Sequence, residues 1–221
     1  MVLSIMALSI RYEVKIMAIK NVLLDDKIIK SARKEFLEHG YRNASLHKIA
    51  ANAGITTGAL YTRYNGKDDL FRSLVKNLLN QIDESSQTIA HQYQEVQLGK
   101  SAEEIIGVIR SEMNAYNALM VENYEECFLF YCRSEGSSVE KQLKEMLHSK
   151  TEQTIAYLST IAKPGVDLTG IKLVMELQFY LFRQMLEYNY QNHLSSSSME
   201  LVDIFEQAGW RAIFENILKV E

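Results

Sequence analysis

Residues 45–70 read SLHKIAANAGITTGALYTRYNGKDDL, and this stretch decides the fold because it predicts two short helices joined by a tight turn. Ser45 is a residue type that caps helices, and the apolar residues after it recur at spacings of three and four, which places them on one buried face. Gly54 supplies the backbone freedom that a sharp turn needs, and Thr56 is the predicted cap of the second helix. The order is that of a helix-turn-helix.

The second of these helices is expected to present a polar, aromatic and cationic surface. Leu60 and Tyr64 lie four residues apart and are predicted to face the core. The remaining surface is formed by Thr57, Gly58, Tyr61, Thr62 and Arg63. In DNA-binding helix-turn-helix units the N-terminal part of the second helix contacts base edges in the major groove. The pattern therefore predicts sequence-specific DNA binding.

The spacing I-A-x-x-A-G-I-T-x-G-x-L-Y-x-x-Y-x-x-K-x-x-L resembles the DNA-binding domain of the TetR family of bacterial transcriptional regulators, over residues 25–70. The resemblance implies a helical regulator that binds double-stranded DNA as a homodimer. Positions that touch DNA in the family correspond here to Ser45, His47, Thr57, Gly58, Tyr61, Thr62, Arg63 and Lys67. Lys48, on the solvent side of the first helix, and Thr56, at the start of the second, complete the predicted DNA-binding set.

Two positions depart from the family's pattern. Arg63 stands where the family usually carries His. Because Arg can hold a phosphate in two bonds, the expected role is kept while its charge no longer depends on pH. Tyr64 replaces the usual Phe, and its hydroxyl needs a partner or a route to water.

Composition and charge agree with an all-α protein that has a basic head. The 47% hydrophobic content excludes disorder, and one Pro with ten Gly in 221 residues favours long helices. Residues 21–67 hold eight Lys or Arg against four Asp or Glu, a charge of +4, whereas residues 68–221 carry −10. Only the N-terminal part is therefore suited to contact phosphates. No apolar run reaches the roughly 18 residues that span a membrane. Because the two Cys of the chain are not placed to bridge each other, a reduced, cytoplasmic chain is expected.

Three segments are predicted. Residues 1–20 form an N-terminal extension outside the resemblance; residues 11–16 alternate like an edge strand, and the extension is either an artefact of an upstream start before Met17 or an arm. Residues 21–68 form a three-helix DNA-binding head, and residues 69–221 form a helical ligand-binding and dimerisation body. Helix signals predict long helices near residues 67–97, 101–120, 123–134, 138–162, 168–192 and 199–220.

The last two predicted helices each carry a stripe of apolar and small residues. One stripe is formed by Leu173, Leu177, Leu181 and Gln184, and the other by Leu201, Phe205, Ala208 and Ala212. The resemblance implies that these helices pair with their copies in a second subunit. Stripe geometry alone leaves open that both stripes pack within the monomer.

The middle of the chain is rich in aromatic and sulfur-containing residues, which would suit a small apolar or aromatic effector. The candidate ligand-binding residues are Met113, Tyr116, Met120, Tyr124, Phe128, Tyr131, Phe179, Phe182 and Arg183. Such residues at helical spacing are also ordinary core. Arg183 would bind an anionic ligand if it faced inward, but an ion pair with Glu187, four residues on, is the favoured reading.

Other functional classes find little support. No catalytic triad order, phosphate loop or metal motif is present, so an enzyme, a cofactor and a metal site are not expected. Cys127 and Cys132 lie five residues apart on a predicted helix, about 140° around its axis, and cannot readily bridge each other. The sequence predicts a ligand-responsive repressor that binds an inverted-repeat operator as a dimer. The alternative is a ligand-binding or scaffold dimer of the same fold that no longer binds DNA specifically.

Overall fold

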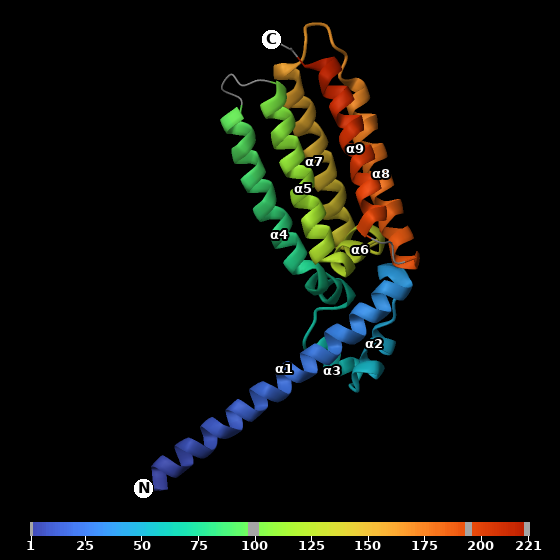
Figure 1. Ribbon diagram of the computed structural model, residues 1–221. Coiled ribbons are helices and arrows are strands. Elements are labelled where there is room, and N and C mark those ends of the chain that lie inside the picture. Colours follow the sequence, from blue (N-terminus) through green and yellow to red (C-terminus); the bar gives the residue numbers. More distant parts are fainter. Residues whose placement is uncertain (1, 97–101, 193–195, 219–221) are drawn as a thin grey trace. The chain divides into compact units, whose positions relative to one another are not determined.

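The computed structural model describes residues 2–96, 102–192 and 196–218, and the regular secondary structure within these ranges is helical throughout, which confirms the all-α prediction (Figure 1). The helices are α1 (Val2–Asn43), α2 (Leu46–Ala53), α3 (Thr57–Tyr61), α4 (Lys67–Val96), α5 (Ala102–Glu122), α6 (Tyr124–Cys132), α7 (Ser138–Ile161), α8 (Thr169–Asn192) and α9 (Ser196–Ile217). The chain divides into two compact units, residues 1–74 (the head) and residues 75–221 (the body). Helix α4 begins in the head and ends in the body.

The N-terminal extension is helical, so the edge strand expected over residues 11–16 is wrong. Helix α1 starts at Val2 and meets no Gly or Pro before Gly40, where φ is 69° and the helical geometry breaks. A six-residue alternation is a weak signal beside so long a stretch without helix-breaking residues.

The core of the head lies along one face of α1. Ile28, Ala32 and Phe36 follow each other at a spacing of four and are fully buried. The Phe36 ring makes an edge-on contact with Phe71 of α4, with centroids 4.9 Å apart. Leu60 anchors α3 with 1% of its surface exposed. Helix α2 packs against the long α1, and α3 packs against α2. Both short helices depend on this packing, since helices of five to eight residues are not stable by themselves.

The body is a bundle in which α5 runs alongside the body part of α4, α7 runs alongside α5, and α8 and α9 lie next to each other (Figure 1). One hydrophobic cluster of the body is formed by the buried residues Leu158, Ile171, Phe214 and Leu218. Beyond α7 the chain turns at Pro164 and Gly165, and the N–H of Lys163 donates to the carbonyl oxygen of Ile217 at 2.8 Å. The end of α7 is therefore fastened to the end of α9.

Both predicted stripes on α8 and α9 are exposed in the chain. Leu173 and Leu177 are 59% and 52% exposed, and Leu201 and Phe205 are 69% and 68% exposed. The other stripe members are also exposed: Leu181, Gln184, Ala208 and Ala212. The alternative that these stripes pack within the monomer is therefore wrong. No helix in the described ranges is both long and apolar enough to cross a lipid bilayer.

Candidate DNA interface

Helix α2 begins and ends as the sequence predicts. Ser45 has extended backbone angles and its hydroxyl oxygen accepts a hydrogen bond from the N–H of Lys48 at 3.4 Å. Gly54 ends the helix in the left-handed conformation, with φ 75° and ψ 31°, and its N–H reaches the carbonyl oxygens of Ala50 and Ala51. The turn between the two short helices therefore depends on a backbone conformation that Gly adopts without strain.

Helix α3 is a five-residue helix capped at its start by Thr56, whose hydroxyl oxygen accepts from the N–H of Ala59 at 3.1 Å. At its other end the Thr62 hydroxyl donates to the carbonyl oxygen of Ala59 at 2.7 Å. Leu60 faces the core, whereas the Tyr61 ring is 56% exposed. One buried residue thus fixes α3 while its neighbours remain accessible to a partner.

The predicted DNA-binding residues fall into two groups by exposure. The exposed members are His47, Lys48, Thr56, Gly58, Tyr61 and Thr62. The half-buried members are Ser45, Thr57, Arg63 and Lys67. All ten lie between Ser45, the cap of α2, and Lys67, the first residue of α4, so the structure brings them together in the head. Their contacts with DNA remain a prediction.

The two half-buried cations are already engaged by groups of the head. Arg63 Nε lies 3.0 Å from Asp25 Oδ1 of α1. Lys67 Nζ donates to the carbonyl oxygen of Arg42 at 3.0 Å and sits 5.0 Å from the centroid of the Tyr41 ring. Burial lowers the pKa of Lys67, and the nearby Glu35 carboxylate partly offsets this. Both side chains therefore connect the helix-turn-helix to α1.

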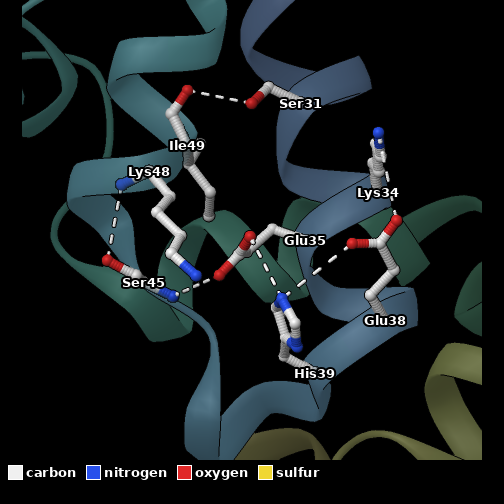
Figure 2. A network of polar contacts seen from close by, with 8 residues as sticks. All are labelled: Ser31, Lys34, Glu35, Glu38, His39, Ser45, Lys48 and Ile49. Atoms are coloured by element: carbon white, nitrogen blue, oxygen red, sulfur yellow. Dashed lines mark hydrogen bonds and ion pairs between the residues drawn. The ribbon is translucent and has the colours of Figure 1, made fainter.

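A polar network between α1 and α2 was missed by the sequence analysis (Figure 2). The Glu35 side chain is 6% exposed, and its Oε1 accepts the backbone N–H of Ser45 at 2.9 Å. One turn earlier the Ser31 hydroxyl donates to the carbonyl oxygen of Ile49 at 2.9 Å. On the outer side His39 Nε2 lies 3.8 Å from Glu35 Oε2. In the sequence, Glu35 stands out only as an acidic residue next to Phe36 on the apolar side of α1. That pattern does not indicate which partner the carboxylate binds.

Most of the candidate effector-binding residues pack against one another in the body. The Tyr131 ring contacts Phe179 and Phe182 of α8, with centroids 5.9 Å and 4.9 Å apart. The Phe128 ring is fully buried and stacks on Tyr190 at 4.2 Å. Met120 is also buried, and the hydroxyls of Tyr116 and Tyr124 bond to Ser86 and to the Leu186 carbonyl oxygen. The side chain of Met113 lies outside the described residues. Ligand binding by this set remains a prediction.

The favoured ion pair between Arg183 and Glu187 is wrong. Glu187 instead pairs with Arg133, whose Nη1 and Nη2 lie 2.5 Å and 3.1 Å from its two carboxylate oxygens. The Arg133 guanidinium also lies 4.3 Å from the centroid of the Phe128 ring. A bidentate geometry and an aromatic surface give Glu187 a better partner than an exposed neighbour on its own helix. Arg183 is exposed.

Residues 28–74 match the family model described as bacterial regulatory proteins, tetR family. The head is a TetR-family helix-turn-helix domain. The chain is 38% identical over 50 residues to the HTH-type transcriptional repressor BepR of Brucella suis, covering 23% of this chain and 24% of that protein. It is 35% identical over 57 residues to the negative transcriptional regulator IcaR of the icaADBC biofilm operon of Staphylococcus epidermidis, covering 26% and 31%. These matches span about a quarter to a third of the relatives, which are transcriptional regulators and not enzymes.

The fold of the whole chain is similar to that of solved TetR-like regulators. A TetR-like transcriptional regulator from Rhodococcus sp. RHA1 superposes with a TM-score of 0.54 at 15% identity, covering 86% of this chain and 95% of that one. NalD of Pseudomonas aeruginosa, the secondary repressor of the MexAB-OprM multidrug efflux pump, gives 0.56 at 15% identity, covering 89% and 98%. At such identities the likeness shows the fold alone.

Proposed function

We propose that this chain is a sequence-specific DNA-binding transcriptional regulator that binds an inverted-repeat operator as a homodimer. The observation that carries the proposal is α3, where one buried Leu60 anchors a helix whose Gly58, Tyr61 and Thr62 are exposed. A recognition helix needs this combination, because its neighbours must reach base edges while its orientation stays fixed. The positive charge of the head beside the negative charge of the rest limits phosphate contact to the head.

Ten residues are proposed to contact DNA: Ser45, His47, Lys48, Thr56, Thr57, Gly58, Tyr61, Thr62, Arg63 and Lys67. Those around Thr57 to Tyr61 read bases, and most of the others bind phosphates. Because Arg63 is paired with Asp25 in the chain by itself, its contact with a phosphate involves exchanging or sharing that partner.

The second subunit is proposed to cover α8 and α9. Their exposed apolar residues would leave water in a dimer, and the exposed Ala208 and Ala212 would permit a close approach of helices. Two heads related by a two-fold axis would then read half-sites about one helical turn apart.

Regulation is proposed to be repression, relieved by a small apolar or aromatic effector in the body. The relatives BepR and IcaR are described as a repressor and a negative regulator. An effector that shifts the body part of α4 would act on the head through the same helix, and allosteric coupling is typically about 1 to 3 kcal/mol.

Selection of binding sites from random double-stranded DNA by the purified protein, at about 0.1 M salt, tests the proposal. We expect enrichment of an inverted repeat. If a folded, dimeric protein enriches nothing, the DNA-binding proposal fails and the scaffold or ligand-binding alternative takes its place.

A matched pair of variants ties the binding to α3. Thr62→Ala and Thr160→Ala each remove an exposed hydroxyl that donates at 2.7 Å to a carbonyl oxygen three residues earlier, the first in the head and the second on α7. Operator affinity should fall for Thr62→Ala, and further for Tyr61→Ala, and should not change for Thr160→Ala. Equal losses for both Thr variants would show that the hydroxyl acts through folding.

A further inference from the structure

Helix α2 begins with half of a capping box, a motif in which two side chains satisfy backbone N–H groups at a helix start. Ser45 supplies the first half, because its hydroxyl accepts the N–H of Lys48. The second half requires a Glu or Gln three residues after the cap, whose side chain accepts the N–H of the cap residue itself. That position holds Lys48, which has no acceptor atom.

The missing acceptor comes from α1. Glu35 Oε1 accepts the N–H of Ser45 at 2.9 Å, from a side chain that is 6% exposed. A buried carboxylate without partners would be costly, so this bond satisfies both the helix start and the acid. In a capping box the acceptor lies on the same helix, whereas here it lies on α1, so the bond also connects α1 to the start of α2.

A second bond sets the register of α2 along α1. Ser31 and Glu35 are one turn apart on α1, and their partners, the Ile49 carbonyl oxygen and the Ser45 N–H, are one turn apart on α2. Figure 2 shows the Ser31–Ile49 contact above the Glu35–Ser45 contact, both joining α1 to α2 or its cap. Because both bonds end on backbone atoms, they fix the position of α2 whatever side chains α2 carries toward solvent.

We propose that Glu35 is a positioning residue for operator recognition: by accepting the Ser45 N–H from α1 it holds the helix-turn-helix in the orientation that reads DNA, and it leaves Lys48 exposed to contact phosphate. The inference rests on the proposed DNA-binding function. It assigns to α1 a part in specificity although Glu35 itself does not touch DNA.

The test compares operator affinity with affinity for random DNA, at a temperature at which every variant is folded. Glu35→Leu removes the acceptor, and we expect the ratio of the two affinities to fall about tenfold or more, the effect of one lost base contact. Glu35→Gln keeps an acceptor oxygen and should retain the ratio within about twofold.

A double variant separates positioning from capping. Lys48→Gln places a capping-box residue on α2 itself, so Glu35→Leu combined with Lys48→Gln gives Ser45 an acceptor without the connection to α1. Compared with Lys48→Gln alone, the double variant should melt at a similar temperature and still show the tenfold loss in the affinity ratio. A purely structural role would predict recovery of both quantities.

Four results would overturn the proposal. They are an unchanged ratio in Glu35→Leu, an equal loss in Glu35→Gln, recovery of the ratio in the double variant, and a wild-type protein that selects no DNA. The last result also ends the proposed function, whereas the first three leave the wild-type operator intact and reject only the role of Glu35.

Discussion

At the scale of single residues, the pairing of Arg63 with Asp25 determines how this cation meets DNA. The two side chains are 26% and 49% exposed, and ion pairs at such sites contribute only about 0.2 to 1 kcal/mol. A phosphate can therefore compete with Asp25 for the guanidinium. Arg63 would then pass from a contact within the head to a contact with DNA.

Neutralising Asp25 should therefore strengthen operator binding. Asp25→Asn is expected to raise the affinity up to about fivefold, and Arg63→Gln should lower it and reduce the slope of log affinity against log salt by about 0.9. Asp26→Asn, at the exposed neighbouring acid, is the control for the general loss of negative charge. Weaker binding in Asp25→Asn with an unchanged salt slope in Arg63→Gln would assign Arg63 a purely structural role.

The two cysteines should resist thiol reagents in the folded protein. Burial raises the pKa of Cys127 to about 12 and, together with the Glu187 charge, raises the pKa of Cys132 to about 11. Since the thiolate is the reactive form, little of it exists near pH 8. We expect mass spectrometry to find both thiols free after brief iodoacetamide treatment, and both modified when denaturant is added. As the pH rises toward 11, Cys132 should react first; rapid labelling at pH 8 would contradict these environments.

At the scale of elements, the helices could be predicted where their ends are marked locally. Ser45, Gly54 and Thr56 set the limits of α2 and α3, and Pro164 follows the end of α7. Contacts between helices are not signalled by any comparable residue in the sequence. Glu187 pairs with Arg133, 54 positions away, and not with Arg183 on its own helix. The hydrogen bond from Ser45 to Glu35 likewise joins the start of α2 to α1. The residues proposed for the DNA interface could be named from the sequence and stay a prediction, whereas the contacts from other helices that hold them in place could not be predicted.

The turn between α2 and α3 should be sensitive to a single methyl group. Gly54 has φ 75°, and a Cβ there meets no atom within 4 Å, so Gly54→Ala suffers backbone strain without a clash. We expect it to lower the free energy of unfolding by about 1 to 2 kcal/mol in a denaturant titration. Gly107→Ala, in open space within α5, should raise it by about 0.5 to 1 kcal/mol. Equal effects would mean that the turn conformation is not strained by a side chain.

At the scale of the whole molecule, the exposed apolar residues of α8 and α9 are hard to reconcile with a monomer. Leu173, Leu177, Leu201, Ile204 and Phe205 are each more than half exposed, on two helices that run next to each other. Burying a Leu or Phe side chain contributes about 1.5 to 3 kcal/mol relative to leaving it in water. In a symmetric dimer the same side chains of both subunits would be buried, so each residue would contribute this free energy twice.

Charged substitutions on this surface should produce monomers. Light scattering is expected to give twice the chain mass of 25.4 kDa for the wild type and about 25.4 kDa for Leu177→Glu or Phe205→Glu. The monomeric variants should also bind the operator more weakly, because a single head reads only a half-site. Val121→Glu adds the same charge at a position of α5 that is 75% exposed, and it should leave the mass unchanged. A monomeric wild type would reject this interface.

The chain has a single tryptophan, Trp210, so its intrinsic fluorescence reports on one known place in the structure. Trp210 lies on α9, between Ala208 and Ala212 in the sequence, stacks on Phe214 with centroids 5.3 Å apart, and donates from Nε1 to Gln178 Oε1 of α8 at 3.0 Å. Its ring therefore borders the hydrophobic cluster of the body, on the side of α9 opposite the exposed stripe. Its emission wavelength should change when α8 moves against α9, because that movement would break the bond to Gln178, so a shift of these two helices can be followed in unlabelled protein.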